Sequence, residues 1–322
     1  MKKILVTGSA GFIGARVSEM LLQEGYQVIG VDNLNDYYDV NLKLWRLEKL
    51  KKHSNFIFYK IFIENYNELK KIFQENCPEG VINLAARTGV RYSLENPFIY
   101  LSTNNGGNLN LLELCREYGV SKFVLTSTSS LYAGQKMPFK ESLPVDTPIS
   151  PYAASKKAAE IMAYTYHYLY GLDVTILRYF TVYGPAGRPD MATFRFIKWM
   201  IEGVPLVIFG DGQQERDFTY IDDISRGTIS ALKSLGYEII NLGNNHPYKL
   251  LEIIRLMEKY AGKKAQFKYK KLHKADMKAT WADIKKAKKY LNWQPQFSLE
   301  EGIKRTVNWT KNNWEWIRKI KV

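Results

Sequence analysis

The chain has 322 residues, of which 46% are hydrophobic, and it carries a formal net charge of +14 at pH 7. This length and this apolar content allow a sizeable core in one large domain or two. No apolar run is long enough to span a bilayer, and an apolar strand from residue 3 leaves no room for a signal peptide, so we expect a cytoplasmic protein with no membrane partner.

The positive charge raises the question of a nucleic-acid partner, because Lys and Arg neutralise phosphates. The lysines, however, are scattered over expected helices and become denser only over 263–289, without a recognisable nucleic-acid motif. We therefore expect solvated helix faces and no nucleic-acid partner. A mildly basic field would also attract an anionic nucleotide substrate.

The N-terminus combines a strand, a glycine-rich turn and a helix in that order. Residues 2–7 form an apolar run, Gly8-Ser-Ala-Gly11-Phe-Ile-Gly14 follows it, and helical periodicity begins near residue 17. Glycines let the backbone approach a pyrophosphate at the positive end of a helix. A merely structural turn is the alternative interpretation, but the strand context favours dinucleotide binding.

The second strand, 28–31, ends in Asp32. A carboxylate at this position accepts hydrogen bonds from an adenosine ribose diol and repels a ribose phosphate. The sequence therefore predicts NAD rather than NADP as the cofactor.

Strand-like and helical runs alternate through the first half of the chain. Strands are expected at 81–84, 122–125 and 174–177, and helices around 109–118 and 152–170. This order is typical of an α/β fold with a Rossmann-type doubly wound parallel sheet. We expect an NAD-binding domain over 1–183, with a possible later strand near 237–242, and a smaller mixed α/β domain over 184–322 that mainly binds the substrate.

Tyr152 and Lys156 lie four residues apart in the expected helix 152–170, after the hydroxyl run of Thr128, Ser129 and Ser130. A phenol with a pKa of about 10 can act as a base at neutral pH only if a nearby cation stabilises its phenolate. One helical turn brings the lysine to the same face, so we expect its ammonium beside the phenol oxygen. Such a pair also occurs on ordinary solvated helices.

With these motifs, the chain resembles the extended short-chain dehydrogenase/reductases and, within them, the NAD-dependent nucleotide-sugar epimerases. Three segments are most similar to UDP-glucuronate 4-epimerases, namely Asp32-Asn-Leu-Asn-Asp-Tyr-Tyr-Asp39, Gly89-Val-Arg-Tyr-Ser-Leu-Glu-Asn-Pro97 and Gly187-Arg-Pro-Asp-Met-Ala192. The resemblance covers nearly the whole chain. It implies a homodimer formed by helices around 100–118 and 152–170.

The resemblance also implies the residues of the site. The catalytic residues would be Tyr152 as base, Lys156 as its electrostatic partner and Thr128, which shares the substrate proton. The implied cofactor-binding residues are Gly8, Gly11, Phe12, Ile13, Gly14, Asp32, Asn33, Asn35, Ile63, Leu84, Ala85, Ala86, Asn104, Thr126, Tyr152, Lys156 and Tyr179. The implied substrate-binding residues are Arg91, Thr128, Ser129, Ser130, Thr181, Arg188, Arg216 and Asp276.

A UDP-glucuronate substrate would be oxidised at carbon 4, rotate, and be reduced on the opposite face to UDP-galacturonate. Arg216 would hold the diphosphate, with Asp276 near the nucleoside. The 4-keto uronate is a β-keto acid that can lose carbon dioxide, and neutral hydroxyls from Thr128 to Ser130 and Thr181 could bind its carboxylate without fixing it to one face. Arg188 would screen or steer that carboxylate. Alternatively, these hydroxyls simply finish a strand.

The hydroxyl run also discriminates among relatives. Nucleotide-sugar 4,6-dehydratases resemble Thr-Asp-Glu here, glucuronate decarboxylases resemble Thr-Ser-Glu, and galactose-type 4-epimerases usually carry Asn at the position of Thr181. A UDP-glucose/UDP-galactose 4-epimerase is the second hypothesis. A non-catalytic NAD-binding regulator is a more remote one, which the intact Tyr152 and Lys156 argue against.

Several residues depart from the family pattern. Relatives generally show Gly-Asp-Ile at 61–63, where this chain has Ile-Phe-Ile, so the usual side-chain acceptor for the adenine amino group is absent. Backbone contacts would have to replace it. Asn105 and Gly107 replace apolar residues, and His273 replaces Arg or Gln. His246 and His273 have no neighbouring pair suited to a metal, and we expect none.

Overall fold

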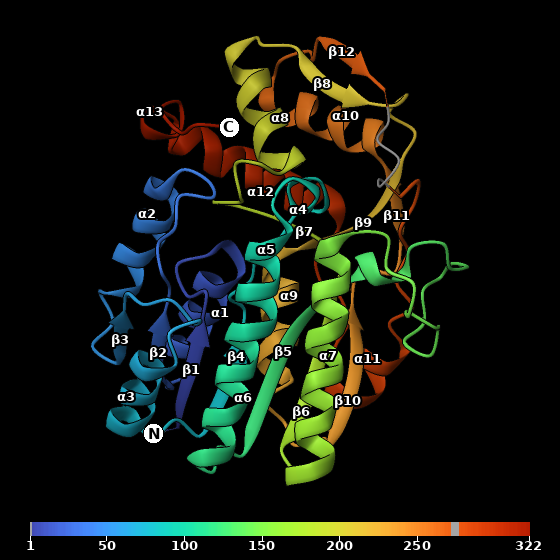
Figure 1. Cartoon of the computed structure of the whole chain (residues 1–322). Coiled ribbons are helices and arrows are strands. Elements are labelled where there is room, and N and C mark those ends of the chain that lie inside the picture. Colours follow the sequence, from blue (N-terminus) through green and yellow to red (C-terminus); the bar gives the residue numbers. More distant parts are fainter. Residues whose placement is uncertain (1, 272–276) are drawn as a thin grey trace.

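The structure is a computed structural model that describes residues 2–271 and 277–322. Its larger part is a seven-stranded parallel sheet with helices on both faces (Figure 1). The strands are β1 (Lys3–Thr7), β2 (Gln27–Val31), β3 (Phe56–Tyr59), β4 (Gly80–Asn83), β5 (Lys122–Thr128), β6 (Asp173–Tyr179) and β10 (Tyr237–Leu242). Their order across the sheet is β10-β6-β5-β4-β1-β2-β3. The predicted doubly wound α/β fold is confirmed, and β3 is a strand that the sequence analysis missed.

Alternation along the strands explains the two helical layers. In β1, Ile4 and Val6 belong to one buried cluster and Leu5 to the other, because successive side chains point to opposite faces. The first cluster is covered by α1 (Phe12–Gln23), α9 (Ile221–Ser230) and α11 (Lys285–Leu291), with α2 (Val40–Leu50) beside α1. The second is covered by α3 (Tyr66–Asn76), α6 (Asn108–Glu117) and α7 (Pro151–Tyr170). Two short helices and a π-helix lead into α6, namely α4 (Val90–Glu95), α5 (Pro97–Tyr100) and the π-helix Leu101–Gly107.

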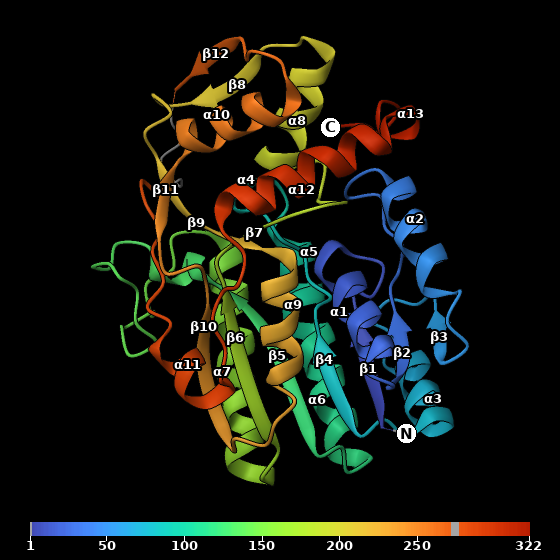
Figure 2. The ribbon, with the colours of Figure 1, turned by 180° about the vertical axis from the view of Figure 1, so that it is seen from behind.

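A smaller lobe sits over the carboxyl ends of the large sheet (Figures 1 and 2). It contains β7 (Thr181–Tyr183), α8 (Ala192–Glu202), β8 (Leu206–Phe209), β9 (Glu215–Tyr220), β11 (Pro247–Lys249), α10 (Leu250–Ala261), β12 (Phe267–Lys270), α12 (Leu299–Asn312) and α13 (Trp314–Ile317). Its strands form two small sheets, β11-β9-β7 and β12-β8. The chain returns twice from this lobe to the large sheet. After β9 it forms α9 and β10, and after β12 it forms α11.

The C-terminal helices also contact the larger part. The ring of Trp45 in α2 lies 5.3 Å from the rings of both Trp309 and Trp316, measured between centroids. Within the described residues, no helix combines the length and the apolar character that crossing a membrane would require.

Candidate active site

A cavity of about 450 Å³ runs along the carboxyl ends of the large sheet. Turns after six strands supply one wall, and the 181–191 segment of the smaller lobe supplies the other. The predicted residues that line it are Gly8, Gly11, Phe12, Ile13, Gly14, Asp32, Asn33, Asn35, Ile63, Leu84, Ala85, Ala86, Thr126, Thr128, Ser129, Ser130, Tyr152, Lys156, Tyr179, Thr181 and Arg188. We call the part around Tyr152 and Lys156 the β5 end, and the part around Asp32 and Ile63 the β2 end.

The glycine turn forms a tight cradle whose backbone leaves no room for side chains. A Cβ on Gly14 would lie 2.0 Å from the Gly8 carbonyl oxygen, and one on Gly11 would lie 2.9 Å from the same atom. Gly8 has φ +68°, and its Cβ would lie 2.9 Å from the Ala85 amide nitrogen. Glycine thus keeps this turn compact, and the turn and the start of α1 line the cavity together, which fits a dinucleotide diphosphate.

Asp32 is buried at the β2 end, where two backbone groups orient its carboxylate. Its Oδ1 accepts from the Leu34 amide at 2.8 Å, and its Oδ2 accepts from the Ala10 amide at 3.2 Å. The Lys43 side chain lines the same end. Burial lowers the pKa of Lys43 from 10.5 to about 8, although the Asp32 charge opposes this shift. A fixed carboxylate after β2 fits the diol of an adenosine ribose.

The β5 end is built from the last residues of β5 and the first turns of α7. The Thr128 hydroxyl accepts from the Ser130 amide and contacts the Ser130 hydroxyl, both at 3.1 Å. Burial raises the pKa of the Tyr152 phenol, while a hydrogen bond with Thr128 and the charge of Arg188 lower it. The ring of Tyr100 meets the Tyr152 ring edge-on, with 6.1 Å between the ring centroids, an arrangement that aromatic pairs favour.

Helix α7 presents Tyr152, Lys156 and Glu160 at intervals of four residues, so they lie along one face. The Lys156 ammonium donates to the Thr126 carbonyl at 2.8 Å, and its predicted position beside the phenol oxygen of Tyr152 stays a prediction. Burial lowers the pKa of Lys156 from 10.5 to about 8, and the Glu160 charge opposes that shift. Glu160 itself forms a buried, bidentate ion pair with Arg178 of β6, at 2.7 and 2.9 Å. This ion pair anchors the helix to the sheet.

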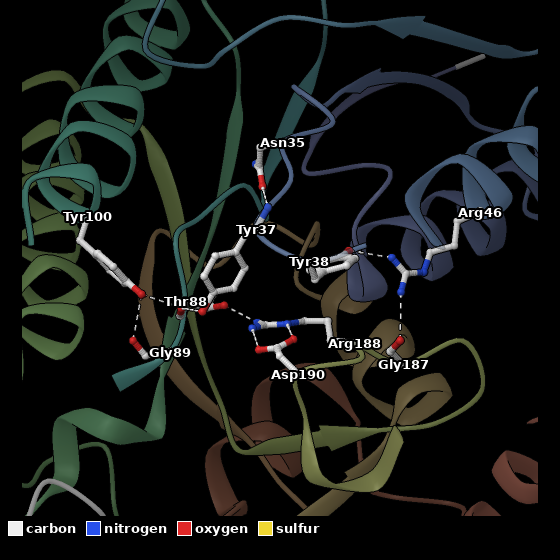
Figure 3. Close-up of polar contacts among 10 residues, drawn as sticks. All are labelled: Asn35, Tyr37, Tyr38, Arg46, Thr88, Gly89, Tyr100, Gly187, Arg188 and Asp190. Carbon is white, nitrogen blue, oxygen red and sulfur yellow. Dashed lines mark hydrogen bonds and ion pairs between the residues drawn. The ribbon is translucent and has the colours of Figure 1, made fainter. Parts of the chain in front are cut away.

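Arg188 lies where three loops meet (Figure 3). Its guanidinium binds the Asp190 carboxylate through two hydrogen bonds and donates to the Thr88 hydroxyl. The Thr88 carbonyl in turn accepts from the hydroxyls of Tyr37 and Tyr100, both at 2.7 Å. The charge of Arg188 is thus present in the cavity wall, but a carboxylate already balances it.

Four predicted residues lie elsewhere. Asn104 is buried and holds the loop after β4 through the backbone of Arg87, with which it exchanges two hydrogen bonds. Arg91 lies over the Phe209 ring at 3.8 Å, and Arg216 donates to the Glu215 carbonyl at 2.8 Å, both outside the cavity wall. Asp276, like His273, lies outside the described residues.

Several residues of the wall were not predicted from the sequence. They are polar side chains carried mainly by loops, namely Tyr37, Lys43, Glu64, Thr88, Thr103 and Asp190. The segments that resemble the family include Tyr37 and Asp190 and could have drawn attention to these two. Nothing in the local pattern pointed to Glu64 or Thr103. Among residues 2–271 and 277–322, no three His, Cys, Asp or Glu side chains are grouped as a metal site.

Comparisons with known proteins agree with this geometry. The family model described as GDP-mannose 4,6 dehydratase matches residues 5–306. A UDP-glucuronate 4-epimerase of Thermodesulfobacterium geofontis is 64% identical over 319 residues, covering 99% of each chain. A UDP-glucuronic acid 4-epimerase from Bacillus cereus, solved with UDP-glucuronic acid and NAD, superposes with a TM-score of 0.91 at 41% identity, covering 97% of this chain and 99% of that one. A Thermotoga maritima UDP-glucose 4-epimerase, solved with UDP-glucose, gives 0.89 at 35% identity, covering 97% and 99%.

Proposed function

This chain belongs to the GDP-mannose 4,6 dehydratase family, and we propose that it is an NAD-dependent UDP-glucuronate 4-epimerase that forms UDP-galacturonate through a 4-keto intermediate. One observation carries the proposal. A single cavity joins a glycine cradle and Asp32 at its β2 end to Thr128, Tyr152 and Lys156 at its β5 end. The first set suits a dinucleotide, and the second suits removal of a proton from a sugar hydroxyl.

The cradle of Gly8, Gly11 and Gly14 would hold the diphosphate of NAD, and Asp32 would hold its adenosine ribose. When bound, NAD accepts the hydride from carbon 4 of the sugar and later returns it. Tyr152 takes the proton of the 4-hydroxyl, and Thr128 shares that proton through its hydroxyl. Because burial raises the pKa of Tyr152, its phenolate needs positive charge nearby. We assign this charge to Lys156, which lies on the same face of α7 and whose protonated form the Glu160 charge favours.

Inversion requires the 4-keto sugar to rotate within the cavity before it is reduced. Neutral hydroxyls from Ser129, Ser130 and Thr181 line the wall that the sugar carboxylate would pass. Neutral donors can release a carboxylate more readily than a free cation can. The ion pair with Asp190 would moderate the hold of Arg188 in the same way. We assign the substrate diphosphate to Arg216 and the nucleoside to Asp276 as part of the proposal.

The family is named after a dehydratase, but this chain lacks the pair of acidic side chains that the dehydratase reaction needs. Elimination of water needs an acid pair after Thr128, and Ser129 and Ser130 stand there. A hydroxyl with an ordinary pKa cannot replace a carboxylate in acid/base catalysis at neutral pH.

A homodimer and a cytoplasmic location belong to the same proposal. Large apolar side chains on two neighbouring segments face solvent, including Phe98 at 80%, Leu101 at 56%, Ile161 at 55% and Tyr168 at 74% exposed. The first two lie in α5 and at the start of the π-helix, and the last two lie in α7. A second copy packed on these segments would cover them, because such clusters commonly mark interfaces.

The test compares two substrates of the purified protein. UDP-glucuronate should be converted to UDP-galacturonate with a kcat/KM at least roughly a hundredfold above that for UDP-glucose, with little release of carbon dioxide. Preferential formation of UDP-galactose from UDP-glucose would instead support the second hypothesis. Binding of NAD without turnover of either sugar would support a non-catalytic regulator.

A further inference from the structure

The far wall of the β2 end carries a side-chain carboxylate, that of Glu64, where the sequence led us to expect backbone contacts alone. The segment after β3 exposes Phe62, which is 53% accessible to solvent, and buries Ile63, which is 4% accessible. Phe62 therefore points away from the cavity and offers it no polar atom. Ile63 and Glu64 line the wall in its place.

Only one of the two oxygens of the Glu64 carboxylate has a hydrogen-bond partner among the described residues. Its Oε1 accepts from the Thr103 hydroxyl. Its Oε2 is buried and has no hydrogen-bond partner among the residues that the structure describes. Leaving a buried carboxylate oxygen without a donor is costly, so a ligand that brings an N–H group to this oxygen would gain affinity.

Neighbouring residues hold Glu64 in this position. The side-chain amide of Asn110 donates to the carbonyls of both Ile63 and Glu64 at 3.0 Å. Gly107 ends the π-helix, and a Cβ there would lie 2.5 Å from Ile63 Cδ1, so glycine lets Ile63 approach. The same π-helix carries Thr103, and this rare helix form is frequent at functional sites.

The surroundings of the free oxygen indicate the chemical class of the donor. The apolar side chains of Ile61, Ile63 and Leu84 line this part of the cavity and suit the faces of a flat heteroaromatic ring. Asp32 lies at the same end and suits the ribose attached to such a ring. We infer that Glu64 accepts a hydrogen bond from the exocyclic amino group of the cofactor's adenine, replacing the acceptor absent at Phe62.

This inference rests on the proposed NAD cofactor, and the experiment separates the two. Cofactor-stripped protein is titrated by calorimetry with NAD and with nicotinamide hypoxanthine dinucleotide, in which a carbonyl oxygen replaces the amino group. Wild-type protein should prefer NAD, because an acceptor facing Glu64 is repelled. Glu64→Ala should weaken NAD binding by roughly tenfold or more, and Glu64→Gln, which keeps one acceptor oxygen, should weaken it less. Binding of the hypoxanthine dinucleotide should stay the same or tighten in both variants, because the repulsion is removed.

Glu68→Gln is the matched control, because Glu68 is an exposed carboxylate in the first turn of α3 and lies outside the cavity wall. It should leave both affinities unchanged. Thr103→Val should weaken NAD binding less than Glu64→Ala does, because it removes only the group that orients the carboxylate.

Equal losses for both dinucleotides in the Glu64 variants would show a structural role and overturn the inference. Unchanged affinities in both variants would also overturn it. Wild-type protein that binds neither dinucleotide would overturn the proposed cofactor and this inference with it.

Discussion

The β5 end of the cavity is built from regular secondary structure, whereas the β2 end is built from loops and the side chains that tie them together. Thr128 ends a strand, and Tyr152 and Lys156 occupy the first turns of a helix. Asp32 and Glu64, by contrast, follow strands on segments without regular structure. Backbone amides orient the carboxylate of Asp32, and the Thr103 hydroxyl orients that of Glu64.

The difference separates two kinds of constraint. At the β5 end, backbone hydrogen bonds of β5 and α7 set the spacing of the reacting groups, so precise placement comes from rigid elements. At the β2 end, a change of one loop residue can be compensated by another loop residue that reaches the same space. The chain can therefore retain its chemistry at one end while it reorganises its recognition of the cofactor at the other.

The largest expected effect tests the β5 end directly. Tyr152→Phe should reduce turnover of UDP-glucuronate by roughly 10²–10⁴-fold, because it removes the base and leaves the ring and its contact with Tyr100. Bound NAD, measured by absorbance, and the melting temperature should stay near those of the wild-type protein. Turnover at the wild-type rate would refute the assignment of Tyr152 as the base.

The second prediction concerns the anchor of α7. Glu160→Gln should lower the free energy of unfolding by about 3–5 kcal/mol, because it leaves the buried Arg178 without its counter-ion. Urea denaturation measures the change. The control is Glu48→Gln, in an exposed pair with Lys51, which should cost less than about 1 kcal/mol. Equal losses of stability in the two variants would mean that the buried ion pair does not hold α7 against the sheet.

The third prediction concerns the lowered pKa values of the two buried lysines, one at each end of the cavity. The folded pKa values of Lys43 and Lys156, about 8, lie below the ordinary 10.5, so between these values the unfolded chain binds more protons. The free energy of unfolding should therefore rise with pH in this window. Lys43→Met and Lys156→Met should each remove roughly 1 kcal/mol of the rise between about pH 7.5 and about pH 9 in cofactor-stripped protein, measured by urea denaturation.

A loss of slope in the Lys156 variant alone would show that the β2 end is more hydrated than its buried lysine suggests. A loss in neither variant would contradict both pKa directions.

The smallest expected effect concerns the loops around Arg188. Tyr37→Phe removes a hydrogen bond to the Thr88 carbonyl, which still accepts from Tyr100, so the free energy of unfolding should fall by about 1 kcal/mol or less. The exposed Tyr168→Phe serves as the control. A loss above about 3 kcal/mol would mean that this loop is held as rigidly as the β5 end.

Much of the fold followed from local patterns, and the exceptions have identifiable causes. The alternation of strands and helices predicted the parallel sheet, because its apolar runs are bounded and periodic. The strand β3 escaped notice because it has only four residues, all partly buried at the sheet edge. Asn104 does not line the cavity but exchanges two hydrogen bonds with the backbone of Arg87, which does, and its predicted contact with the cofactor stays a prediction.

What the sequence by itself determined is the sheet, the glycine cradle and the shared helix face of Tyr152 and Lys156. These depend on periods of two and of nearly four residues, which a chain displays locally. Only the tertiary structure decided that Glu64 faces the cavity, that Lys156 donates to Thr126, and that Arg188 meets Thr88 across a hundred residues of chain. No periodicity sets the direction of a loop side chain, so its partner is chosen by whichever distant segments the packing brings beside it.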